Sequence, residues 1–85
     1  MEIQQVVGDL VTSRRVPGLK QTSLRILASQ SGQLSVATDL IGVPPGKWVF
    51  TAGGSAARHG TGDFEILTDL TILGIIDFWN PGEWG

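Results

Sequence analysis

The sequence predicts an all-β fold built from short strands. Runs of β-branched and aromatic residues recur along the chain, and such residues favour strands. Turn signals separate these runs at short intervals. They are Pro17-Gly18, Ser31-Gly32, Pro44-Pro45-Gly46, Gly53-Gly54, Gly60-Thr61-Gly62 and Asn80-Pro81-Gly82. Short strands between frequent turns are typical of a small barrel or a sandwich.

The first three strands are expected in the N-terminal half of the chain. Their bounds are Glu2–Thr12, Ser23–Ala28, and Leu34 to Asp39 or Leu40. Gly8 interrupts the first strand, and a glycine inside a strand often marks a bulge. Alternation places Leu34, Val36 and Thr38 on one face of the third strand. The loop 29–33, centred on Ser31-Gly32, indicates a hairpin connection between the second and third strands.

A fourth strand is expected at Lys47–Ala52, where Trp48, Phe50 and Ala52 alternate with the other three residues. Pro45-Gly46 precedes it and fits the two central positions of a type II turn, because proline fixes φ and glycine accepts a positive φ. A short helix is then expected at Ser55–His59. The hydroxyl of Ser55 is predicted to cap its first turn, and Gly60 to end it.

The fifth strand is expected at Leu70–Trp79 and is apolar on both faces. One face carries Leu70, Ile72, Ile76 and Phe78, and the other carries Leu73, Ile75 and Trp79. A barrel strand has one face inside and one outside, so the outer face needs cover. A helix or loop of the same chain is one possible cover. A neighbouring subunit is the favoured one, because little of this short chain remains to supply it.

Composition points to one small domain that gains stability by association. The chain has 85 residues, no cysteine, one histidine and only 16% charged residues. Disulfides and thiolate metal sites are therefore excluded, a structural zinc site is disfavoured, and oligomerisation is the remaining remedy for a small core. No signal peptide or membrane span is apparent, so a cytoplasmic protein without membrane contact is expected.

The stretch GGSAARHGTGDF, residues 53–64, is the strongest candidate for chemistry, and it does not match a catalytic motif. Ala57 replaces the last glycine of a G-x-S-x-G elbow, and no Lys-Ser/Thr pair forms a phosphate loop. Ser55 and His59 could share a helical face, but a triad also needs a third group and a pocket. No catalytic, cofactor-binding or metal site is therefore predicted. The chain is expected not to be an enzyme.

Two further groups of residues also favour structural roles. Asp63, Glu65 and Asp69 are expected to be turn and surface carboxylates, because a calcium loop needs a denser set of oxygen ligands. Trp48, Trp79 and Trp84 could stack bases on a barrel of the OB type. The net charge of -2 and the scattered basic residues argue against nucleic acid as a partner. An OB-type barrel that binds a ligand or oligonucleotide remains the alternative function.

The order of several motifs resembles the vertex proteins of bacterial microcompartments. DLIGVPPGKWVF is followed by GGSAAR and then by LTDLTILGIID. The stretches SRRVPGLKQTSLRI and GDFEILTDLTILGIIDFW are similar to the B form found in α-type carboxysomes rather than to the A form. The resemblance covers Glu2 to about Trp79. It implies a single small five-stranded β-barrel domain, OB-like and with one short helix, over residues 1–79, and leaves 80–85 as a tail of unassigned role.

The resemblance implies a structural protein that forms a homo-pentamer. Such pentamers seal the five-fold corners of a shell of hexameric carboxysome shell proteins, which surrounds ribulose bisphosphate carboxylase. The implied segment at the five-fold axis and pore is Gly53, Gly54, Ser55, Ala56, Ala57 and Arg58. Arg58 either lines the pore or makes an inter-subunit salt bridge with Asp39 or Asp69. The expected subunit contacts are Ile72, Leu73, Ile75, Ile76 and Asp39.

Overall fold

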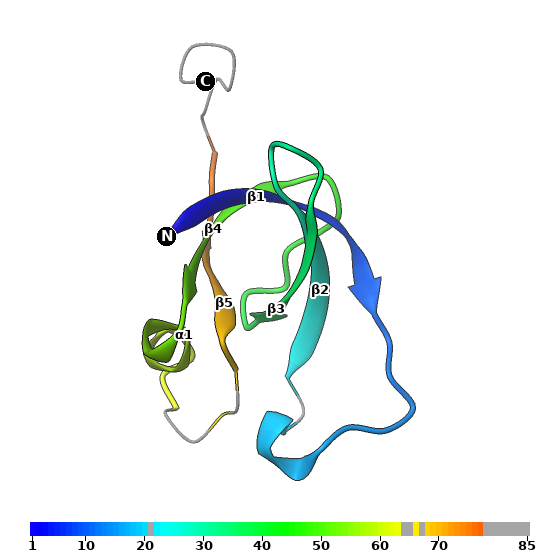
Figure 1. The fold of residues 1–85 in the computed structure, drawn as a ribbon, viewed down its shortest axis with the longest axis vertical. Coiled ribbons are helices and arrows are strands. Elements are labelled where there is room, and N and C mark those ends of the chain that lie inside the picture. The colour runs from blue at the N-terminus through cyan, green and yellow to red at the C-terminus, as the bar shows by residue number, and fades with distance from the viewer. Residues whose placement is uncertain (21, 64–65, 67, 78–85) are drawn as a thin grey trace.

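The computed structural model shows a closed five-stranded barrel with one short α-helix on its outside (Figure 1). It describes residues 1–20, 22–63, 66 and 68–77. The elements in chain order are β1 (Glu2–Leu10), the 3-10 helix η1 (Pro17–Leu19), β2 (Ser23–Ala28), β3 (Leu34–Asp39), β4 (Trp48–Gly53), α1 (Ser55–Gly60) and β5 (Leu70–Ile75). The predicted fold class is therefore confirmed. The predicted division at residue 79 lies outside the described residues.

The strands close in the order β1-β2-β3-β5-β4. All neighbours are antiparallel except β3 and β5, which are parallel and are joined by the single residue pair Thr38 and Thr71. By contrast, β2 and β3 are paired along their whole length, from Ser23 opposite Asp39 to Ala28 opposite Leu34. The barrel wall, meaning the ring of paired strands, is therefore thin between β3 and β5, where the fewest residues pair.

The core fills the inside of the barrel with aliphatic side chains from all five strands and from the loop before β4. Its buried members are Val6, Leu27, Ala37, Val43, Val49 and Ile72, and Leu70 and Ile75 pack against them. Leu27 and Val49 are completely buried. Burying one such side chain stabilises the folded state by roughly 1.5–3 kcal/mol.

Three local predictions are confirmed. The register of β1 against β2 shifts between Val6 and Gly8, so a bulge lies where the glycine interrupts the strand. The hairpin between β2 and β3 is closed by the N–H of Gly32, which donates to the carbonyl of Ser29 at 2.9 Å. Gly46 has a φ of 93°, the positive value that the second central position of a type II turn requires.

The strand ends differ from the predicted ones because a strand stops where its partner stops. β1 ends at Leu10 rather than at residue 12, since Leu10 pairs with Leu24 and β2 begins one residue earlier. β4 runs one residue further than predicted, because Gly53 pairs with Leu70. β5 ends at Ile75, close to the start of β4. The rest of the predicted strand at 78–79 lies outside the described residues.

The two faces of β5 are not those that simple alternation predicts. Phe50 lies opposite Gly74 and Thr51 opposite Ile72, so Leu73 is an extra residue between them. This shift turns Ile75 to the same side as Ile72, and both contact the core. The predicted placement of Ile75 on the opposite face is therefore wrong.

Helix α1 of the same chain covers the outer face of β5. The hydroxyl of Thr71 donates to the carbonyl of Ala57 at 2.7 Å. A Cβ on Gly60 would lie 2.5 Å from the Leu73 side chain, so strand and helix are in close contact there. Figure 1 shows α1 beside β4 and β5. This six-residue helix therefore supplies part of the cover, while Leu73, Ile75 and Ile76 stay half-buried, so additional cover by a neighbouring subunit remains a prediction.

Candidate functional site

The segment Gly53–Arg58 forms the turn from β4 into α1. Gly54 has φ 63° and ψ −144°, a conformation that residues with a side chain rarely adopt. Its N–H donates to the carbonyl of Asp69 at 3.0 Å, which ties the turn to the start of β5. Within one chain a Cβ on Gly54 would meet nothing within 4 Å. The backbone angle alone therefore explains a glycine at this position, without any crowding by other copies.

The predicted cap of α1 is wrong by one residue. Gly54 occupies the N-cap position, and no side-chain hydrogen bond caps the helix. Ser55 is the first residue inside α1, because the positive φ that turns the chain out of β4 falls on Gly54. The hydroxyl of Ser55 therefore has no capping role.

The small residues at this corner divide into an exposed group and a buried one. Gly53, Gly54, Ser55 and Ala56 are exposed, whereas Ala57 is completely buried against the barrel of its own chain. Arg58 is half-buried. Among the six residues predicted at the five-fold axis, the first four offer surface to other copies. Ala57 contributes to the fold of its own subunit, and the axis itself remains a prediction.

The residues considered for catalysis or metal binding are not assembled into a site in the described part of the chain. No hydrogen bond joins Ser55 to His59 there, and no group of three potential His, Asp or Glu ligands is found in the same residues. Asp63 forms an ion pair with Lys20 at 2.7 Å. Glu65 lies outside the described residues. Nor does any helix of the described chain have the length and hydropathy to cross a membrane.

Asp39 organises the loop between β3 and β4. Its Oδ1 accepts from the N–H groups of Ile41 at 2.8 Å and Gly42 at 2.9 Å, and its Oδ2 accepts from Val43 at 2.7 Å. The Nε of Arg25 also donates to Oδ2, at 2.9 Å. Burial by itself raises the pKa of Asp39, but the three backbone N–H groups and the charge of Arg25 outweigh it and lower the pKa below its ordinary value.

Two of the residues predicted at the subunit interface have no surface for a neighbour. The side chain of Asp39 is 0% exposed and binds its own loop and Arg25. Ile72 is 2% exposed and belongs to the core. Leu73, Ile75 and Ile76 are half-buried, so for them a subunit contact stays a prediction. Of the two predicted partners for an inter-subunit salt bridge with Arg58, Asp69 is exposed and Asp39 is not.

Exposed apolar side chains gather at other residues, for which no subunit contact was predicted. Leu34 and Val36 on β3 are 65% and 44% exposed, and Leu40 and Ile41 after β3 are also exposed. Alternation had placed Leu34 and Val36 on one face, but it could not tell which face lies inside. Ala37 packs in the core, so Leu34 and Val36, which lie on the opposite face of β3, point outward.

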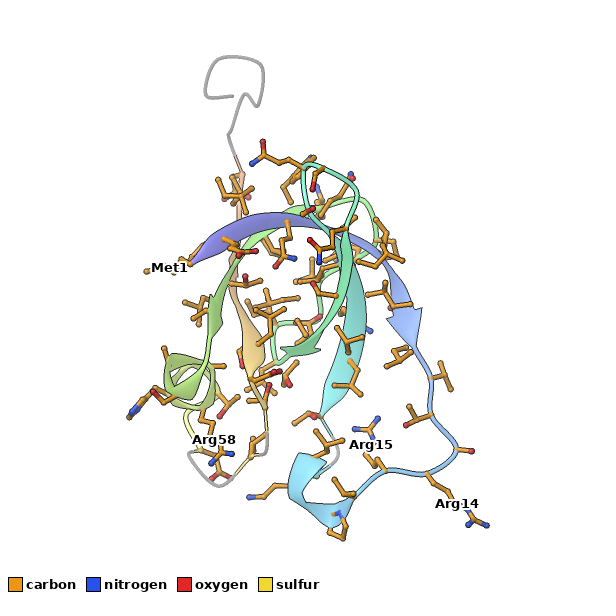
Figure 2. All side chains as sticks on the ribbon, viewed as in Figure 1. Met1, Arg14, Arg15 and Arg58 are labelled. Carbon is orange, nitrogen blue, oxygen red and sulfur yellow. The ribbon has the colours of Figure 1, made fainter. Side chains whose placement is uncertain are left out.

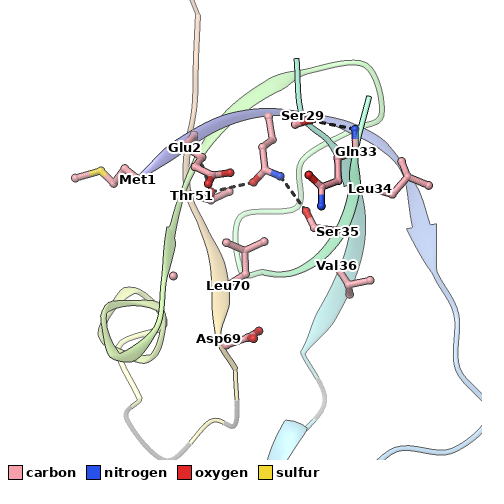
Figure 3. A pocket seen from close by; sticks show the side chains of 12 residues that line it. Met1, Glu2, Ser29, Gln33, Leu34, Ser35, Val36, Thr51, Asp69 and Leu70 are labelled. Atoms are coloured by element: carbon pink, nitrogen blue, oxygen red, sulfur yellow. Dashed lines mark hydrogen bonds between the residues drawn. The ribbon is translucent and has the colours of Figure 1, made fainter. Parts of the chain in front are cut away.

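A pocket of about 710 Å³ lies beside the N-terminal half of β3, which does not pair with β5 (Figure 3). Its floor is polar. The Thr51 hydroxyl donates to Oε1 of Gln4 at 3.0 Å, and Nε2 of Gln4 donates to the Ser35 hydroxyl at 2.9 Å. Gln4 and Thr51 are buried, and this chain of hydrogen bonds satisfies them across the barrel where backbone pairing is missing. We call this space, lined also by Met1, Glu2, Leu34, Val36 and Asp69, the mouth pocket.

Comparison with known proteins relates nearly the whole chain to shell proteins of microcompartments. The family model described as "Ethanolamine utilisation protein EutN/carboxysome" matches residues 1–77. The chain is 63% identical to carboxysome shell vertex protein CsoS4B of Halothiobacillus neapolitanus over 79 residues, which are 93% of this chain and 98% of that protein. The solved structure of CsoS4B from the same organism superposes with a TM-score of 0.87, covering 92% of this chain and 100% of that one.

A more distant relative carries an oligomeric state in its description. The GrpN pentameric microcompartment shell protein from Rhodospirillum rubrum is 26% identical to this chain. Its structure superposes with a TM-score of 0.81 over 94% of this chain and 98% of that one. The single-chain barrel with its outer helix is thus similar to a subunit known from a pentamer.

Proposed function

Because the chain belongs to the EutN/CcmL family, whose model covers residues 1–77, we propose that it is a structural protein that forms pentamers and caps the five-fold vertices of a carboxysome shell. The observation that carries this proposal is the 63% identity to a carboxysome shell vertex protein over nearly the full length of both chains. The protein would act in the shell by filling space and sealing it, and not by catalysis.

The surface of the single chain supports assembly. Charged residues make up only 16% of the sequence, below the roughly 25% of an average soluble domain. Large aliphatic side chains are exposed at several places, among them Leu34, Leu40 and Ile41. Exposed apolar surface of this kind is typical of a protein that covers it with neighbours.

A pentamer can close a shell for a geometric reason. Hexameric shell proteins, the proposed neighbours, tile a flat sheet, and a closed polyhedron needs five-fold corners where the curvature is concentrated. The exposed small residues Gly53, Gly54, Ser55 and Ala56 allow five copies to approach closely at one corner. The shell so completed would retain ribulose bisphosphate carboxylase and its substrate CO₂.

The alternative of an oligonucleotide-binding barrel is not favoured. The mouth pocket is lined by the carboxylates of Glu2 and Asp69 and by no lysine or arginine. The two carboxylates outnumber the single α-amino group of Met1 in this lining, so it disfavours phosphate groups, whereas nucleic-acid sites carry a basic surface. We therefore propose neither nucleic acid nor membrane as a partner.

The vertex function can be tested by expressing hexameric carboxysome shell proteins with and without this chain. We expect closed polyhedral shells with it, and open or flat assemblies without it, in electron micrographs of the purified material. Native mass spectrometry of the chain alone should give a mass five times that of the 9.0 kDa monomer. A monomer at micromolar concentration, together with shells that close equally well in its absence, would contradict the proposal.

A substitution of Ala56 tests whether the corner at residues 53–56 is crowded in the pentamer. In the single chain Ala56 is exposed on α1, and leucine is a good helix former, so Ala56→Leu should leave the barrel's stability within about 0.5 kcal/mol. If five copies crowd there, overpacking should cost about 1–3 kcal/mol per site and reduce the pentamer yield measured by native mass spectrometry.

Ser55→Ala is the matched control for Ala56→Leu. It lies next to Ala56 but removes bulk, and Ser55 has no capping hydrogen bond to lose. Its pentamer yield should equal that of the wild type. Equal yields for both variants would show that residues 53–56 are not crowded in the assembly.

A further inference from the structure

The loop after β1 is a basic projection on an otherwise acidic chain. Residues 11–20, here called the basic loop, contain Arg14, Arg15 and Lys20 and no acidic residue. The whole chain has six basic and eight acidic residues, so three of the six lie in this loop and the remainder of the chain is strongly acidic. Figure 2 shows Arg14 pointing away from the body of the molecule.

Two of the three basic side chains hold the basic loop in place. Arg15 donates from Nη1 to the carbonyl of Thr22 at 2.6 Å, and Lys20 pairs with Asp63 at 2.7 Å. Arg14 makes no hydrogen bond or ion pair with any of the residues that the structure describes. Around it Val11 and Val16 are 90% and 55% exposed. The loop therefore presents one cation between two aliphatic side chains.

The mouth pocket has the complementary chemistry. Its rim carries the aliphatic surface of Leu34 and Val36, and the carboxylates of Glu2 and Asp69, with no basic side chain in its lining (Figure 3). Neither carboxylate forms an ion pair with a residue in the described part of the chain. Figure 2 shows Met1, at the pocket, and Arg14 on opposite sides of the molecule, so one chain cannot bring the two surfaces together.

We propose that the basic loop of one copy docks in the mouth pocket of the next copy around the ring, an inference that rests on the proposed pentamer. A cyclic assembly joins two different patches of each subunit, one facing each neighbour. The guanidinium of Arg14 then faces the carboxylates of Glu2 and Asp69. Val11 and Val16 cover the aliphatic rim, which in the single chain is exposed to water. The thin wall between β3 and β5 is closed by the neighbour.

Reversal of the charge at Arg14 tests this contact. Arg14→Glu places a third carboxylate beside Glu2 and Asp69, and like charges brought together at an interface weaken binding. We expect the concentration at which half of the chains are pentameric to rise at least about tenfold. The double variant Arg14→Glu/Glu2→Arg restores one attractive pair and should recover most of the loss. Analytical ultracentrifugation over a range of concentrations measures both.

Lys47→Glu is the control, because Lys47 is exposed, lies outside both surfaces and changes the net charge by the same amount. A wild type that is pentameric, with Arg14→Glu no weaker than Lys47→Glu, overturns this contact and leaves the proposed function standing. A monomeric wild type overturns both. Circular dichroism of each variant shows that a loss of pentamers is not a loss of fold.

Cross-linking gives an independent measurement, since the chain has no cysteine of its own. Oxidised Val16→Cys/Leu34→Cys should form a ladder of covalent oligomers up to the pentamer. Each single variant should form none, and a mixture of the two should give dimers only. The control is the pair Leu34→Cys/Leu40→Cys, in which both positions are exposed and neither lies in the basic loop. A ladder no stronger than that of the control pair overturns the proposal.

Discussion

Asp39→Asn is expected to lower the free energy of unfolding by about 2–4 kcal/mol. The substitution keeps the shape of the side chain and removes its charge. Oδ2 accepts from two donors, the N–H of Val43 and the Nε of Arg25, and an amide nitrogen in its place would face both as a third donor. With the side chain fully buried, water cannot replace the lost partners. Chemical denaturation followed by tryptophan fluorescence measures the change.

Asp9→Asn provides the comparison for Asp39→Asn. Asp9 pairs with the same arginine, at 2.9 Å from its Nη1, but the Asp9 side chain is 56% exposed. An ion pair screened by water contributes at most about 1 kcal/mol, so the Asp9 variant should remain close to the wild type. Equal losses for the two variants would mean that the charge of Arg25, and not the buried loop contacts of Asp39, determines stability.

The lowered pKa of Asp39 also predicts an acid dependence. A group whose pKa is lower in the folded state binds its proton more tightly in the unfolded state. Its contribution is complete above the ordinary value of 3.8 and is lost as the pH falls from there through the folded pKa. The wild type should therefore lose stability below pH 3.8 more steeply than Asp39→Asn does. Parallel curves for the two proteins in this range would contradict the assignment.

Gly74→Ala is expected to destabilise the barrel by about 1–3 kcal/mol. Gly74 lies on the outer face of β5 opposite Phe50, and an added Cβ would be 2.6 Å from Cε1 and 2.7 Å from Cζ of that ring. The ring must therefore leave its place. Thermal unfolding, with the melting temperature converted to free energy, measures the effect.

Two variants separate overpacking from the other effects of replacing a strand glycine. Gly8→Ala adds the same methyl group where nothing lies within 4 Å, and it should be neutral or slightly stabilising because alanine restricts the unfolded chain. Phe50→Leu removes the ring atoms that the new Cβ would meet, so Gly74→Ala should cost less in that background. Equal costs in both backgrounds would show that the ring is not what excludes a side chain at position 74.

Neither Asp39 nor Gly74 belongs to the two proposed docking surfaces, the basic loop and the mouth pocket. Asp39 holds the loop that carries Leu40 and Ile41, both exposed. Phe50 packs over Gly74 across the paired strands β4 and β5. Loss of either contact should therefore reduce pentamer formation only in proportion to the loss of folded chains.

The local backbone of this protein could be predicted from its sequence. The bulge at Gly8, the turn at Gly46 and all five strands follow from residue types whose backbone preferences are strong. The short helix was also expected within one residue of its observed end. Each of these features depends on a few neighbouring residues, and that is why local patterns were sufficient.

Only the tertiary structure decided which side of each strand faces the core. The extra residue at Leu73 changes the phase of β5 halfway along, so Ile72 and Ile75 contact the core together. The same structure shows that α1 covers β5 and that Asp39 makes its contacts within its own chain. It also shows that Leu34 and Val36 are exposed. Alternation along a strand defines two faces but does not tell which face lies inside the barrel. That choice depends on packing partners distant in sequence. For the same reason, the surfaces that a neighbouring copy could contact can be identified only from the closed barrel.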